Sequence, residues 1–199
     1  MQTVSRLSRA RSLRLALAVG VAIAVSPLVA NAIKPVAKTT ATTAVKLSVK
    51  RPYAAPQFSG LKNWVNSDTA LTIDALKGKV VLVDFWTFGC INCQNTLPHV
   101  RALYAKYHAQ GFEIIGVHAP EFGYEKDAAN VRDAVKRYGI KWPVAQDNSF
   151  ATWQNYRNQF WPAMYYIDRK GFVRHFYAGE GQYARQDAVV AALLAEPVV

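Results

Sequence analysis

The chain has 199 residues, of which 51% are hydrophobic, enough for one domain with a sizeable core and an additional N-terminal segment. Its formal net charge of +11 is of the size that nucleic-acid-binding proteins carry, but this excess is unevenly distributed. From Pro52 onward the chain has 15 basic and 13 acidic residues, a net charge of only +2. The basic excess therefore belongs to the N-terminal segment, and nucleic acid is not expected as a partner.

Residues 1–32 have the organisation of a secretory signal peptide. An arginine-containing start is followed by an apolar stretch from Leu13 to Val25, a helix-breaking Pro27 and a small-x-small cleavage site that ends at Ala32. We expect cleavage after Ala32 and export to the periplasm. The alternative is an uncleaved membrane anchor, because the segment Leu13 to Ala32 is about 20 residues long, close to the span of a bilayer.

Residues 33–56 are rich in Lys, Thr, Ala and Pro and show no periodic apolar face, so we expect a flexible linker there. The folded domain is then expected to cover residues 57–199. Near its start, two short apolar segments, 64–66 and 71–73, are separated by turn-forming residues. This arrangement predicts an N-terminal hairpin ahead of the main strand.

Strand and helix patterns alternate along the rest of the chain. Apolar, β-rich runs at 80–86 and 112–117 flank a segment with helical spacing at 91–109, which predicts a parallel strand–helix–strand unit. Pro98 is expected to kink this helix. Further expected elements are a helix at 128–138, a short strand at 142–145, a short helix at 148–155, strands at 163–167 and 172–177, and a final helix around 189–194. The order predicts an α/β fold with a helical insert.

Both cysteines of the chain, Cys90 and Cys93, form a Cys-x-x-Cys motif at the expected start of the first helix. Backbone N–H groups and the positive end of the helix dipole stabilise a thiolate there, so we expect Cys90 to have a lowered pKa and to be the nucleophile. Cys93 lies one turn further in, where it can resolve a mixed disulfide on Cys90. A disulfide between them closes almost no loop, so a redox-active role is favoured over a structural one.

Three other side chains are candidates for places near the cysteines. Asp84 lies in an apolar run, where burial would raise its pKa and allow it to exchange a proton with Cys93 through water. The alternative is an exposed carboxylate at the strand end. Trp86 either packs beside the cysteines and contacts substrate or is a core residue only. Glu121 is either a second carboxylate near the site or a solvated loop residue.

A specific constellation of residues resembles the thioredoxin fold. It consists of Asp-Phe-Trp, three residues, Cys-x-x-Cys, four residues and Pro98, and much later Trp161-Pro162 before a strand. The segments 86–93, 116–122, 161–168 and 179–181 are similar to exported TlpA/DipZ-type thioredoxin-like proteins, a redoxin branch. This resemblance implies a three-layer fold in which helices flank a central mixed sheet.

The resemblance also implies an activity, that of a monomeric thiol–disulfide oxidoreductase working outside the cytoplasm without a cofactor. Its partners would be client proteins with cysteines or disulfides and a membrane or soluble thiol redox partner. Pro162 corresponds to the cis-proline of the family, and the backbone of Trp161 would be offered to an extended substrate. Ile91-Asn92 stands where thioredoxin has Gly-Pro, so the resemblance does not define the direction of electron flow.

Two other functions remain open at the level of the sequence. A thiol peroxidase is suggested by Thr87, three residues before Cys90, but Val83 stands where the peroxiredoxin signature Pro-x-x-x-Thr-x-x-Cys has proline. A copper-binding or metal-delivery module is the second alternative, because two thiolates and a histidine can hold copper. The histidines considered for it are His99, His118 and His175. No metal ligands are assigned, since structural zinc needs four ligands.

Overall fold

The computed structural model describes residues 45–197, so the expected signal peptide and residues 33–44 lie outside the described residues. Seven strands form one mixed sheet in the order β1-β7-β6-β3-β4-β5-β2. The strands are β1 (Tyr53–Ala54), β2 (Lys62–Val65), β3 (Val80–Trp86), β4 (Phe112–His118), β5 (Val144–Gln146), β6 (Ala163–Ile167) and β7 (Phe172–Ala178). The α-helices are α1 (Ile91–Tyr107), α2 (Ala128–Arg137), α3 (Ala151–Asn155) and α4 (Tyr183–Ala195).

The central strand β3 pairs with β4 in parallel and with β6 in antiparallel orientation. Helix α1 connects β3 to β4, which confirms the expected strand–helix–strand unit, and it continues through Pro98. Strands β6 and β7 form the expected antiparallel hairpin. Within residues 45–197, no helix combines the length and the apolar character needed to cross a membrane.

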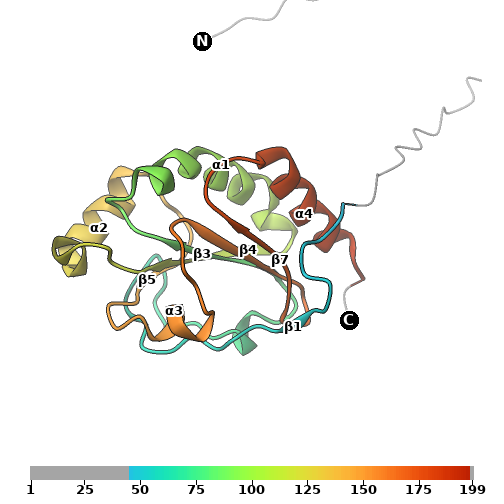
Figure 1. The fold of residues 1–199 in the computed structure, drawn as a ribbon, viewed down its shortest axis with the longest axis horizontal. Helices are drawn as coiled ribbons and strands as arrows, with labels where there is room; N and C mark the ends of the chain where they lie inside the picture. Colours follow the sequence, from blue (N-terminus) through green and yellow to red (C-terminus); the bar gives the residue numbers. More distant parts are fainter. Residues whose placement is uncertain (1–44, 198–199) are drawn as a thin grey trace, which may run out of the picture. The chain divides into compact units, whose positions relative to one another are not determined.

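Alternation along β3 divides the interior into two cores, because successive side chains of a strand point to opposite faces of the sheet. Val80 and Leu82 pack with residues of α1, α2 and α4. Val81 and Val83 pack in a second cluster on the other face, where α3 lies (Figure 1). Asp84 follows the register of Val80 and Leu82, so its carboxyl group lies on the face that α1 covers.

The structure corrects the expected hairpin at 64–66 and 71–73. β2 pairs instead with β5 in antiparallel orientation, and residues 71–73 are not in a strand. Asn66 ends β2 in the left-handed region, and its side-chain amide donates to the carbonyls of Ile140 and Trp142. The chain is therefore tied to the segment before β5, while Ile73 enters the second core.

The structure also corrects the extent of the flexible linker, which was expected to reach residue 56. β1 pairs with β7, and the N–H of Ala55 donates to the carbonyl of Gly171 at 2.8 Å. Before β1, the apolar Val45, Leu47 and Val49 pack against the two cores. These residues alternate with polar residues, which is the two-residue period of a strand. The basic and threonine-rich composition of the segment obscures this pattern.

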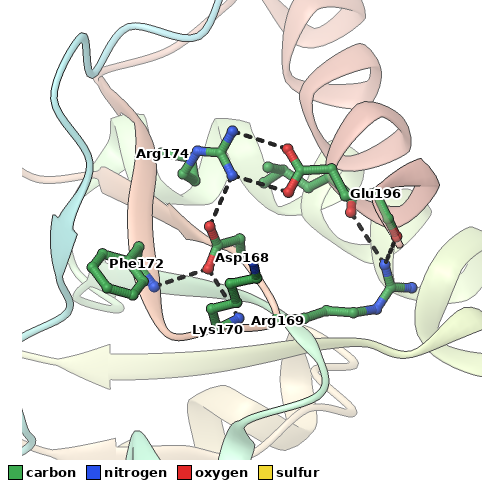
Figure 2. Close-up of polar contacts among 7 residues, drawn as sticks. Asp168, Arg169, Lys170, Phe172, Arg174 and Glu196 are labelled. Carbon is green, nitrogen blue, oxygen red and sulfur yellow. Dashed lines mark hydrogen bonds and ion pairs between the residues drawn. The ribbon is translucent and has the colours of Figure 1, made fainter. Parts of the chain in front are cut away.

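A buried carboxylate joins the β6–β7 turn to the end of α4 (Figure 2). Asp168 accepts hydrogen bonds from the backbone N–H groups of Lys170 and Phe172, both at 3.0 Å, and from the Arg174 guanidinium at 2.8 Å. Arg174 also pairs with Glu196, just past α4. Because Asp168 is buried, loss of its contact with Arg174 would leave a buried charge without a counter-charge. The network therefore stabilises the fold.

Candidate active site

Cys90 occupies the N-cap position of α1, as the sequence predicts. β3 ends at Trp86, and a short turn leads to Cys90, whose backbone is extended (φ −74°, ψ 117°) before the helix begins. The N–H of Cys93 donates to Cys90 Sγ at 3.4 Å. The Cys90 side chain is half-buried, whereas Cys93 is only 1% exposed. The two free thiols therefore differ in access to solvent and to a client.

The two thiols also differ in acidity. The pKa of Cys90 is lowered to about 7, first by a hydrogen bond from the Cys93 thiol and then by the backbone N–H groups of Cys93 and Asn92, against partial burial and the negative charge of Glu121. The pKa of Cys93 is raised, because it donates to Cys90, is buried and lies near the charges of Cys90 and Asp84. Near neutral pH, a large fraction of Cys90 is thus thiolate, whereas Cys93 remains a thiol.

Asp84 is buried in the middle of the sheet, so the alternative of an exposed carboxylate at the strand end is wrong. Burial raises its pKa to about 7, and its Oδ1 atom has no hydrogen-bond partner among the described residues. Its negative charge contributes to the raised pKa of Cys93, so the two groups lie within electrostatic range of each other. A carboxyl group with a pKa near 7 can both accept and donate a proton at neutral pH.

The Trp161-Pro162 peptide bond is cis, in agreement with the correspondence to the family's cis-proline. Trp161 is half-buried and packs against the core cluster that contains Cys93 and contacts Cys90. Its indole Nε1–H donates to the carbonyl of Ala119 at 3.0 Å. The segment 161–162 and the cysteines therefore adjoin the same cluster.

Trp86 is a buried residue of the core. It is 2% exposed and packs edge-on against His118, with ring centroids 5.3 Å apart. The reason is strand alternation, which turns Trp86 toward the face covered by the helices. Trp86 therefore packs in the core cluster that also contains Cys93, and a contact with substrate stays a prediction.

Sequence reasoning missed Glu125, a fully buried carboxylate that contacts Gly89, the residue before Cys90. Its Oε1 accepts from the N–H of Gly89 at 2.8 Å, and its Oε2 accepts from the N–H groups of Glu121 at 2.6 Å and Phe122 at 2.8 Å. The carboxylate thus joins the residue before Cys90 to the loop after β4. Nothing in the local sequence distinguishes Glu125 from a solvated acid. Glu121 itself is exposed, but its charge reaches Cys90.

The three histidines do not assemble a metal site with the cysteines. His118 is buried, with Nε2 3.2 Å from the Thr87 hydroxyl, and burial lowers its pKa to about 4, so its ring is neutral. His99 stacks on Tyr183 of α4, and His175 lies in β7. In the part of the chain that the structure describes, no group of three or more His, Cys, Asp or Glu side chains is arranged to hold a metal ion.

Comparison with protein families matches residues 53–176, which include both cysteines, Asp84 and the cis-proline, to the AhpC/TSA family. The chain belongs to this family. Its fold is thioredoxin-like: a thiol-disulfide isomerase from Corynebacterium glutamicum superposes with a TM-score of 0.63 at 25% identity, covering 72% of this chain and 98% of that structure.

Two curated relatives are also similar to this chain. Protein DipZ from Mycobacterium tuberculosis is 47% identical over 142 residues, which is 70% of this chain and 20% of DipZ. The chain thus spans about a fifth of that relative's length. Thiol-disulfide oxidoreductase YkuV from Bacillus subtilis is 30% identical over 142 residues, covering 71% of this chain and 94% of YkuV.

Proposed function

We propose that this protein is a thiol–disulfide oxidoreductase that exchanges disulfides with cysteines of client proteins through Cys90 and Cys93. The observation that carries the proposal is the asymmetry of the pair: a half-buried thiol with a pKa of about 7 beside a buried thiol with a raised pKa. Disulfide exchange needs one accessible nucleophile and one protected resolving thiol. The names of the relatives in the same family support the same reaction.

In the reductive direction, the Cys90 thiolate attacks one sulfur of a client disulfide. The client's S–S bond breaks, its second sulfur leaves as a thiolate, and a mixed disulfide forms on Cys90. Cys93 then transfers its proton toward Asp84 and attacks Cys90 Sγ, which releases the client dithiol and leaves a Cys90–Cys93 disulfide. Two electrons pass to the client. The same steps in reverse oxidise a client, and a thiol redox partner, membrane-borne or soluble, resets the pair.

The segment Trp161-Pro162 is the proposed place for the client backbone beside the reacting sulfur. Its support is the proximity of Trp161 to the cluster that contacts Cys90, together with the correspondence to the family's cis-proline. An extended client strand held by backbone hydrogen bonds would present its disulfide to Cys90 with little dependence on client sequence.

The test is the pH dependence of disulfide reduction by the reduced protein, with hydroxyethyl disulfide as a small substrate. The second-order rate constant should rise with pH through a midpoint near 7, because Cys90 reacts as the thiolate, whereas an ordinary thiol would give a midpoint of about 8.5. Cys90→Ser should abolish the reaction. Failure to reduce the disulfide at any pH, combined with rapid consumption of hydrogen peroxide, would favour the peroxidase alternative.

The proposed place of action is outside the cytoplasm, supported by the signal-peptide pattern of residues 1–32. Protein recovered from an extracytoplasmic fraction should begin just after Ala32, which N-terminal sequencing measures directly. An intact N-terminus recovered from the membrane fraction would instead support the uncleaved anchor.

A further inference from the structure

Large apolar side chains are exposed next to Cys90 in the sequence and in the loop that contacts the turn before it. Ile91, directly after Cys90, is 63% exposed, and Phe122 and Tyr124, in the loop that follows β4, are 49% and 56% exposed. The described part of the chain has three other exposed large hydrophobic side chains: Tyr53, Phe160 and Phe172. Half of these side chains are thus associated with the segments next to Cys90.

The aromatic side chains of the loop form an ordered stack beside the cysteine turn. The rings of Phe122 and Tyr124 are parallel within 3°, with centroids 5.8 Å apart, and Tyr124 also contacts Phe88 at 5.7 Å. The Tyr124 hydroxyl lies only 2.7 Å from the position that a Cβ atom on Gly89 would take. The stack therefore lies against the residues that immediately precede Cys90.

Hydrogen bonds within the chain tie this loop to the segments around it. Glu125 joins its backbone to Gly89 through the three hydrogen bonds described above, and the Asn130 side chain donates to the Tyr124 carbonyl at 2.9 Å. The start of the loop is tied to the cis-proline segment, since Trp161 donates to the carbonyl of Ala119. A preformed aromatic surface loses little conformational entropy when a partner covers it.

We propose that Phe122 and Tyr124, with Ile91, form a docking surface for client segments that carry an aromatic or large aliphatic side chain next to the reacting cysteine. The inference rests on the proposed function and adds a client preference to it. Tyr124 lies against Gly89, the residue before Cys90, and the start of the same loop is bonded to Trp161 of the cis-proline segment. Glu121, exposed and near Cys90, makes no ion pair within residues 45–197, so an apolar or basic neighbour fits better than an acidic one.

The test uses two synthetic peptides of equal length that each contain an internal cystine and differ at one position beside it, tryptophan in one and serine in the other. The full-length reduced protein should reduce the tryptophan peptide about tenfold faster, the usual discrimination of an apolar surface. In the double variant Phe122→Ser/Tyr124→Ser this preference should fall to near unity, while the rate with hydroxyethyl disulfide stays unchanged.

The matched control is Phe172→Ser, which also removes an exposed phenylalanine. Phe172 begins β7, whereas Ala178 at the other end of this strand pairs with Ala163. It should keep the full preference for the tryptophan peptide. Equal rates for the two peptides with the wild-type protein, or a preference that survives the double variant, would overturn the docking surface alone. Loss of reaction with both peptides and with hydroxyethyl disulfide in the wild-type protein would overturn the proposed function as well.

Discussion

Replacing Cys93 with serine is expected to turn the protein into a trap that forms long-lived mixed disulfides and completes no turnover. Cys90 remains half-buried at the N-cap of α1 and can still attack a client disulfide. The second step is lost, because a hydroxyl group cannot displace the client sulfur. The adducts should appear on non-reducing gels and disappear on addition of dithiothreitol, while multiple-turnover activity falls to background.

Two matched variants test the assignment of the roles. Cys90→Ser should trap almost nothing, because Cys93 is buried and its pKa is raised. Cys93→Ala should trap clients more slowly than Cys93→Ser near neutral pH, since it removes the hydrogen bond that is the largest cause of the lowered Cys90 pKa, whereas serine retains a donor. Comparable trapping by the two serine variants would contradict the assignment of Cys90 as nucleophile. No trapping by either, together with tight copper binding by the reduced protein, would favour the metal-binding alternative.

Replacing Asp84 with asparagine is expected to stabilise the domain at alkaline pH and to slow the resolving step. Burial raises the pKa of Asp84 from 3.8 to about 7, so the folded protein binds more protons than the unfolded chain between these values. The contribution of Asp84 to the free energy of unfolding therefore falls as pH rises from 3.8 to 7, by on the order of 4 kcal/mol in total. Asparagine does not ionise, so the variant should lack this decline.

Chemical denaturation at about pH 8 should show Asp84→Asn to be more stable than the wild-type protein, and at acidic pH the difference should vanish. Its turnover should nevertheless drop on the order of a hundredfold, because an amide cannot take the proton from Cys93. Mixed disulfides should then accumulate transiently. A wild-type rate of resolution would remove Asp84 from the mechanism.

Asp168→Asn provides the control of opposite sign. Asp168 is also buried, but its carboxylate is paired with Arg174 and accepts two backbone hydrogen bonds. Its replacement should destabilise the domain at about pH 8, because Arg174 loses its ion pair with the Asp168 carboxylate. Disulfide exchange should continue at the wild-type rate, since Asp168 follows β6 at the end remote from Pro162.

The placement of Cys90 was predictable because it depends on a short stretch of chain. An apolar β-rich run, a turn with Gly89 and a following helical pattern are enough to put Cys90 at a helix N-terminus and Cys93 one turn inside. Alternation along β3 similarly brings Asp84 to the face that α1 covers, and the same rule, applied to Trp86, would have predicted its burial.

Features that depend on pairing between distant segments were decided only by the tertiary structure. β2 pairs with β5 rather than with its neighbour in sequence, and β1 joins the edge strand β7 within a segment whose composition indicated a linker. Glu125 could not be identified because its partners are backbone N–H groups, which every residue except proline carries. By itself the sequence therefore determined where the two cysteines lie on α1, which depends on local helix geometry. The loop beside Cys90 required the folded chain, because only long-range packing selects which backbone groups a buried carboxylate meets.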